Sequence, residues 1–79
     1  MLSPEQSRAA RGWLDWSQDD LAAKARVSLS TIRDFEKGRR TPIPNNIEAI
    51  ERALDEAGIG MTFGPAGKAT GITSGGKPA

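Results

Sequence analysis

The sequence contains neither cysteine nor histidine. Without cysteine the chain has no disulfide framework and no thiolate nucleophile, and without histidine it lacks the usual zinc ligands. No apolar run approaches the roughly 20 residues that a membrane-spanning helix needs, and the first residues, MLSPEQSRAAR, lack the apolar core of a signal peptide. These absences argue against a metalloenzyme and a membrane protein, and they predict a soluble cytoplasmic protein that uses no cofactor or metal.

The chain is also short, with 79 residues. A chain of this size forms one small domain and buries only about 60% of the surface that its unfolded state exposes. Its hydrophobic core is therefore expected to be thin, and a second copy or another partner would add to its stability.

Negative charge is scarce in one part of the chain and abundant in another, although the net charge is only +1. Residues 24–40 hold six basic residues against two acidic ones, a local charge of +4, whereas residues 48–56 hold four acidic residues against one basic residue, a local charge of −3. The first segment can bind phosphate groups, because the field at a docked surface depends on charges within about a Debye length. A solvated surface of mixed charge explains the same pattern equally well.

Serine caps predict the first two helices. Ser3 followed by Pro4 is typical of a helix start, which predicts a helix over residues 4–14. Ser17 is expected to cap a second helix over 18–25, whose first turn contains carboxylates that suit the positive end of the helix dipole.

A third helix is expected after a turn of three residues. Arg26 and Val27 turn the chain, Ser28 caps the new helix, and Gly38 stands where a left-handed residue ends it, so the helix should cover residues 29–37. Two short helices joined by such a turn have the geometry with which proteins place a helix in a DNA groove.

The rest of the chain is expected to hold one more helix and little else. Prolines make residues 39–44 a loop, and the next helix restarts at Asn45 or Asn46 and ends at Gly58. Residues 59–63 could form a short strand, and residues 64–79 are expected to be a flexible tail that packs against nothing. The apolar residues of the helix recur at spacings that predict a core-facing stripe of Ile47, Ile50, Leu54 and Ala57.

The two sides of the third helix are expected to differ. Ile32 and Phe35 point inward, and the other side carries a mixture of apolar, polar and charged residues: Leu29, Ser30, Arg33, Asp34 and Lys37. Alone, this helix suits an ordinary surface helix as well as a groove reader. The preceding helix, the short turn and the basic exit at residues 38–40 favour DNA.

Four stretches of the chain resemble the Cro/cI type helix-turn-helix regulators, also called the XRE family: WSQDDLA at 16–22, VSLSTI at 27–32, FEKGRRTP at 35–42 and ALDEAG at 53–58. The likeness covers about residues 5–63. It implies an all-α fold of four to five short helices around a helix-turn-helix, similar to lambda repressor, with room for a short C-terminal strand. The DNA-binding domain would then span residues 1–63, followed by the tail.

The resemblance also implies roles for individual residues. The first exposed residues of the third helix commonly reach base edges in this family, which assigns base reading to Ser28, Leu29, Ser30, Arg33 and Asp34. Among these, Arg33 can pair with guanine, Leu29 can contact a thymine methyl group, and Ser30 can bond to several bases. Contacts with the phosphate backbone fall to Gln18, which would also brace the third helix, and to Thr31, Lys37, Arg39 and Arg40. A structural ion pair between Arg11 and Glu36 is implied as well.

Two residues depart from the family pattern. Arg26 stands where the turn usually holds a glycine with positive φ, so the turn must tolerate a strained residue or take another shape. Asp34 lies on the face that would meet an anionic polymer. It can accept a hydrogen bond from cytosine or restrain Arg33, or it indicates a copy that has lost DNA binding.

The sequence thus predicts a transcriptional regulator, a repressor, that binds a palindromic operator in double-stranded DNA as a homodimer with its third helix in the major groove. Dimerisation is assigned to Ile59, Met61 and Phe63, with Trp13 or Trp16 as further candidates. The alternative on the same fold is a protein-binding module, such as an antiactivator or an antitoxin-like partner of another regulatory protein. Catalysis has no support, because the carboxylates fall on helix surfaces without a nucleophile or phosphate loop beside them.

Overall fold

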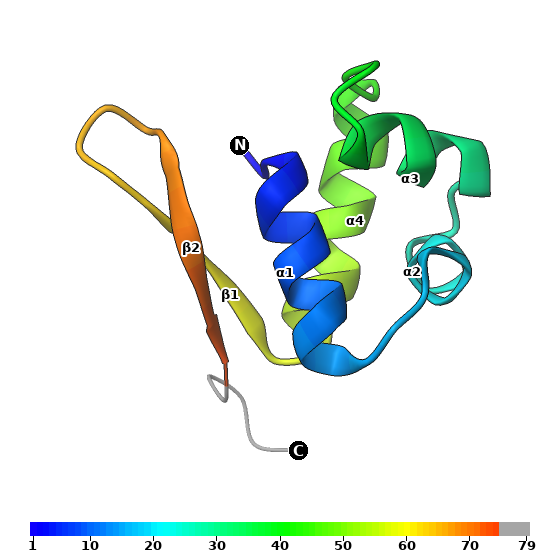
Figure 1. Cartoon of the computed structure of the whole chain (residues 1–79), viewed down its shortest axis with the longest axis horizontal. Helices are drawn as coiled ribbons and strands as arrows, with labels where there is room; N and C mark the ends of the chain where they lie inside the picture. The colour runs from blue at the N-terminus through cyan, green and yellow to red at the C-terminus, as the bar shows by residue number, and fades with distance from the viewer. Residues whose placement is uncertain (75–79) are drawn as a thin grey trace.

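Four helices and one β-hairpin make up the fold in the computed structural model, which describes residues 1–74. In Figure 1 the helices gather on one side and the hairpin lies on the other, beside α1. The chain is therefore mostly helical, but the hairpin makes an all-α description approximate. The elements follow in the order α1 (Pro4–Leu14), α2 (Gln18–Ala25), α3 (Leu29–Glu36), α4 (Pro44–Glu56), β1 (Ile59–Phe63) and β2 (Ala69–Ser74).

Reciprocal serine caps start the first two helices. Ser3 Oγ accepts a hydrogen bond from the Gln6 N–H at 3.1 Å, and the Ser3 N–H donates to Gln6 Oε1 at 3.0 Å. Ser17 and Asp20 form the same arrangement at the start of α2. Since such caps satisfy backbone donors that the first turn leaves unpaired, they fix the helix starts, and the predicted bounds of α1 and α2 are confirmed.

The later helix bounds need two corrections. The third helix ends at Glu36 rather than at Lys37, which serves as its C-cap. The fourth begins at Pro44, earlier than the predicted Asn45 or Asn46, with Ile43 as its N-cap. Proline is compatible with the first position of a helix, because the N–H that it lacks has no partner there in any case.

The core lies where the four helices meet. Its members include Leu21 of α2 and Ile32 of α3, together with Ile50 and Leu54 of α4, all of which are 0% exposed. The predicted apolar stripe of α4 is buried through Ile47, Ile50 and Leu54, while its last member, Ala57, is half-buried. Elements that are separate in sequence thus share one small core, to which Ala10 of α1 and Ile59 of β1 also belong.

The hairpin corrects the prediction that nothing packs after Gly64. Residues Ala69–Ser74 form β2, which pairs antiparallel with β1 in a register that joins Ile59 to Ser74 and Met61 to Ile72. Met61 and Ile72 pack against the core. A Cβ atom at Gly60 would lie 2.6 Å from Thr73 Oγ1, so a side chain at this position would require the Thr73 hydroxyl group to move. Of the predicted tail, only residues 75–79 lie outside the described residues.

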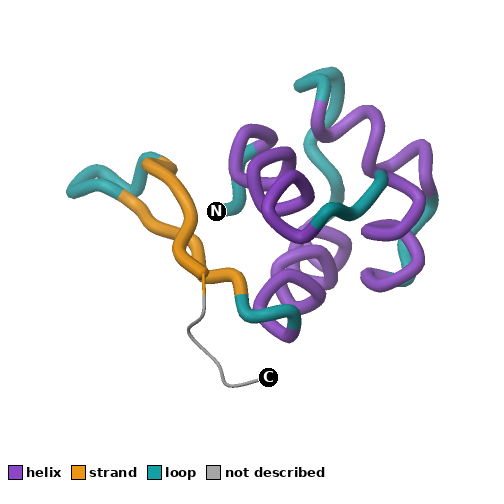
Figure 2. The backbone as a smooth tube through the Cα atoms, turned by 60° about the horizontal axis from the view of Figure 1, so that its bottom comes forward, coloured by secondary structure: helices purple, strands orange, loops and turns teal. Residues whose placement is uncertain are grey.

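One buried glutamine connects this hairpin to α1. Gln6 is 3% exposed, and its Nε2 donates to the backbone oxygens of Thr62 and Gly71, both at 2.9 Å. Figure 2 shows the hairpin projecting from one side of the helices, so this contact helps to fix its position. Within the described part of the chain, every helix falls short of the length and apolar character of a membrane span.

Candidate nucleic-acid interface

The turn between α2 and α3 depends on a residue with left-handed backbone geometry. Arg26 has φ 60° and ψ 42°, and the N–H of Val27 donates to the oxygen of Ala22 at 3.1 Å, which closes the end of α2. Of the two alternatives that the sequence left open at this position, the structure has the strained residue. A second one was not anticipated, because Asp15, between α1 and α2, also has a positive φ of 57°.

Helix α3 has one buried and one accessible side. Ile32 and Phe35 are 0% and 3% exposed, and both belong to the core. The opposite side holds the residues assigned to base reading, of which Ser28, Ser30 and Arg33 are exposed and Leu29 and Asp34 are half-buried. All five residues of the predicted base-reading set are thus at least partly accessible to solvent.

Three hydroxyl groups are clustered at the start of α3. Ser28 Oγ accepts from the Thr31 N–H at 3.1 Å, and it lies 2.7 Å from Thr31 Oγ1 and 3.1 Å from Ser30 Oγ. The Ser28 side chain is thus a helix cap as well as a predicted base contact. Thr31, assigned to phosphate binding, is half-buried beside it.

The basic exit from α3 folds back on the helix. The backbone N–H groups of Arg39 and Arg40 both donate to the backbone oxygen of Asp34, at 2.9 and 3.4 Å, and Gly38 makes the turn with φ 72°. The side chains of Lys37, Arg39 and Arg40 are exposed. Three of the predicted phosphate contacts therefore gather at the C-terminal end of the candidate reading helix.

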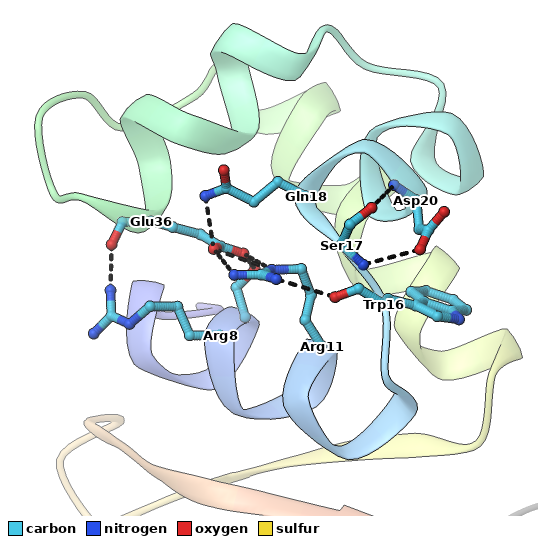
Figure 3. A network of polar contacts seen from close by, with 8 residues as sticks. Arg8, Arg11, Trp16, Ser17, Gln18, Asp20 and Glu36 are labelled. Carbon is cyan, nitrogen blue, oxygen red and sulfur yellow. Dashed lines mark hydrogen bonds and ion pairs between the residues drawn. The ribbon is translucent and has the colours of Figure 1, made fainter.

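A buried ion pair holds α3 against α1 (Figure 3). Arg11 Nη2 lies 2.7 Å from Glu36 Oε1, and Arg11 Nε lies 2.9 Å from Glu36 Oε2. Ser7 Oγ donates to Glu36 Oε2 at 2.6 Å, and Gln18 Nε2 donates to Glu36 Oε1 at 3.2 Å. The ion pair implied by the family resemblance is present, and Gln18 braces α3 by bonding to the same carboxylate.

The ionisation of Glu36 depends on this network. Burial alone would raise its pKa, but hydrogen bonds from Arg11, Ser7 and Gln18, together with the positive charge of Arg11, bring the pKa below its ordinary value. The hydrogen bond to Glu36 in turn raises the pKa of Arg11. The carboxylate is therefore kept ionised although its side chain is only 1% exposed.

Two neighbours of α3 were missed at the sequence level. Arg8 Nη1 donates to the backbone oxygen of Glu36, which places another positive charge at the negative end of the α3 dipole. Ile43, in the loop before α4, lines a shallow cavity of about 200 Å³ together with Ser30 and Asp34. Arg8 lies one helical turn before Arg11, and this spacing could have indicated its contact with α3. No sequence feature indicated that Ile43 lies near α3.

The residues assigned to dimerisation do not form one exposed face. Ile59 is 3% exposed and belongs to the chain's own core, Met61 is half-buried, and Phe63 is 41% exposed. The alternation of the strand puts Ile59 and Met61 on the face of β1 that packs against the core, and a register shift between Thr62 and Phe63 interrupts that face before Phe63, which corrects the prediction. Of the two tryptophans, Trp13 is 67% exposed, whereas Trp16 packs against the core.

Metal-binding side chains are not clustered anywhere in residues 1–74. A comparison with protein families matches residues 8–57 to a family described as helix-turn-helix. A comparison with curated proteins gives no match. The matched range begins at Arg8 in α1, includes the whole of α2, α3 and their turn, and ends just after α4.

Proposed function

The chain belongs to the XRE, or Cro/cI type, helix-turn-helix family of DNA-binding transcription regulators, and on this premise we propose that it is a repressor that binds a palindromic operator as a homodimer. In this proposal α3 lies in the major groove of each half-site. The observation that carries it is the accessible side of α3, which presents Arg33 and Ser30 while Ile32 and Phe35 anchor the opposite side.

Arg33 supports base reading by its chemistry and its position. It is exposed in the last turn of α3, and a guanidinium can donate two parallel hydrogen bonds to guanine O6 and N7. The hydrogen bonds of Arg11 and Gln18 to Glu36 hold α3 in place, so the backbone that carries Arg33 is rigidly positioned. In this proposal Leu29, half-buried one turn earlier, contacts a thymine methyl group.

The surrounding charges support phosphate binding. Lys37, Arg39 and Arg40 are exposed at the C-terminal end of α3, and Gln18 marks the start of α2. Contacts of this kind position a protein on the duplex without reading its sequence. The acidic segment at residues 48–56 lies on α4, apart in sequence from this basic cluster.

The homodimer is supported by the need for two half-sites and by the exposed apolar residues outside α3. A helix-turn-helix dimer contacts half-sites about one helical turn apart. Phe63 on the hairpin and Trp13 on α1 are the exposed large apolar residues that the sequence assigned to this contact. Dimerisation would remove them from water.

The test is binding to a duplex selected by the wild-type protein from a pool of random double-stranded DNA. Arg33→Ala is expected to weaken binding by about tenfold or more, because it removes a bidentate base contact. Arg52→Ala is the matched control, since it removes an equal charge from an exposed position on α4.

If Arg33→Ala and Arg52→Ala weaken DNA binding equally, Arg33 contributes only its positive charge and reads no base. Failure of the wild-type protein to select any duplex at about 50 mM salt would contradict DNA binding. The second candidate is a protein-binding antagonist on the same fold, and the half-buried carboxylate of Asp34 on the reading face favours it. Failure to select any duplex would support this candidate.

A further inference from the structure

Ile43 occupies a position where folding alone favours a different residue. It is the N-cap of α4, and no side-chain hydrogen bond caps that helix. Isoleucine is among the poorest N-cap residues, whereas serine, aspartate or asparagine would satisfy a free backbone donor. The other three helices of this chain all begin with a serine N-cap, so such caps occur in this fold.

The Ile43 side chain is also poorly buried. It is 63% exposed, so most of its apolar surface meets water in the free protein. The residue thus contributes neither a cap nor much to the core. Neither helix capping nor core packing therefore accounts for an isoleucine at this position.

The surroundings of Ile43 connect it to the reading face of α3. The cavity of about 200 Å³ is lined by Ser30, Thr31 and Asp34 on α3 and by Arg40, Pro42, Ile43 and Asn46 from the loop and the start of α4. A duplex that covers Ser30 and Asp34 must therefore approach this loop as well. In the major groove, the apolar feature that a branched aliphatic side chain can contact is the thymine methyl group.

We propose that Ile43 contacts a thymine methyl group beside the bases read by α3 and so adds to the sequence preference. This inference rests on the proposed DNA binding. It makes the loop before α4 a second reading element, in addition to α3. Removal of one methyl contact corresponds to about a fourfold change in affinity.

The experiment uses the duplex selected by the wild-type protein. Each thymine is replaced in turn by deoxyuridine, which lacks only the 5-methyl group. The wild-type protein is expected to lose about fourfold in affinity at the thymine under Ile43. Ile43→Ser should bind the unmodified duplex more weakly and show no further loss at that same thymine.

Two controls separate this contact from folding and from other methyl contacts. The Tm of Ile43→Ser should not fall, because serine gains the missing cap. Ile43→Val keeps a branched aliphatic group and should retain the sensitivity to deoxyuridine. A thymine contacted by Leu29 should remain sensitive in all three proteins.

The inference is overturned if Ile43→Ser keeps every deoxyuridine effect of the wild type, or if it binds the selected duplex as tightly. In both cases the wild-type protein still binds DNA, so the proposed function stands. If the wild-type protein selects no duplex, the proposed function and the inference both fail.

Discussion

Glu36 is a single buried carboxylate that joins three helices. It lies in α3, it bonds to Ser7 and Arg11 of α1, and it accepts from Gln18 of α2. A contact shared by three elements fixes the orientation of α3 more firmly than apolar packing alone, because its geometry is directional.

Glu36→Ala should lower the free energy of unfolding by about 3 kcal/mol. The substitution leaves Arg11 without its counter-charge in a position where its side chain is only 19% exposed. Chemical denaturation monitored by circular dichroism measures the change. Glu48→Ala, at an exposed position of α4, is the control and should change stability by less than about 0.5 kcal/mol. Similar losses in both variants would refute the structural role of the pair.

The lowered pKa of Glu36 also predicts a dependence of stability on pH. A carboxyl group whose folded pKa lies below its unfolded pKa contributes stability above the unfolded value, and this contribution is lost as the pH falls through the folded pKa. The wild-type protein should therefore lose stability below roughly pH 4.5. Glu36→Gln should show a smaller loss over the same range in urea titrations. Parallel curves for the two proteins would argue against a lowered pKa.

Arg26 predicts a stabilising substitution. Arg26→Gly should raise the free energy of unfolding by about 1 kcal/mol, since a left-handed conformation costs a residue with a side chain more than it costs glycine. Asp15→Gly is the comparison, and its gain should be smaller because aspartate tolerates this conformation better than arginine. Thermal unfolding of both variants measures the difference, and a larger gain at Asp15 would contradict the prediction.

What the sequence could predict at this scale depended on how local the interaction was. The comparison with the family pattern marked Arg26 as either a strained residue or part of a different turn, and the structure has the strained residue. The Arg11–Glu36 pair was implied by family resemblance, but the bond from Ser7 was not, because it depends on how α1 packs against α3. The cavity at Ile43 is equally non-local.

At the scale of elements, the hairpin depends on its connection to α1. The Gln6 side chain makes two kinds of contact. Its Oε1 accepts from the Ser3 N–H in the cap of α1, and its Nε2 donates to the backbone oxygens of Thr62 and Gly71 in the hairpin. The helix cap and the hairpin contact can therefore be separated by substitution.

Gln6→Glu should loosen the hairpin while keeping the cap. Ionised glutamate retains the acceptor for the Ser3 N–H but loses the donor, and its second carboxylate oxygen faces the oxygens of Thr62 and Gly71, so the cost is at least about 1–3 kcal/mol. Hydrogen exchange should become faster in β1 and β2 and stay unchanged in α2 and α3. Exchange that rises equally in all elements would indicate a general loss of stability instead.

The helices were more predictable than the hairpin for a physical reason. Serine caps, prolines and apolar spacing act within one turn of helix, so α1 and α2 could be placed to the residue. The pairing of β1 with β2 joins segments across a glycine turn, and the many small residues of β2 suggested a tail. Backbone pairing and the contacts of Ile72 are enough to order that strand.

At the scale of the whole molecule, the proposed dimer predicts an effect of one exposed residue. Phe63→Ser should shift the protein from dimer to monomer at micromolar concentration, because Phe63 is 41% exposed and lies on the hairpin. Its stability to denaturant at low concentration should change little. Analytical ultracentrifugation measures the shift. A wild-type protein that stays monomeric with and without the selected duplex would exclude the homodimer.

The central claim is that α3 reads bases in the major groove, and the position of Arg33 gives its most direct test. Guanines in the selected duplex are replaced one at a time by 7-deazaguanine, which lacks the N7 acceptor of the major groove. The wild-type protein should lose about tenfold in affinity at one guanine of each half-site, and Arg33→Ala should lose nothing further there. Equal binding of the wild-type protein to every substituted duplex, or an undiminished loss in Arg33→Ala, would contradict the account.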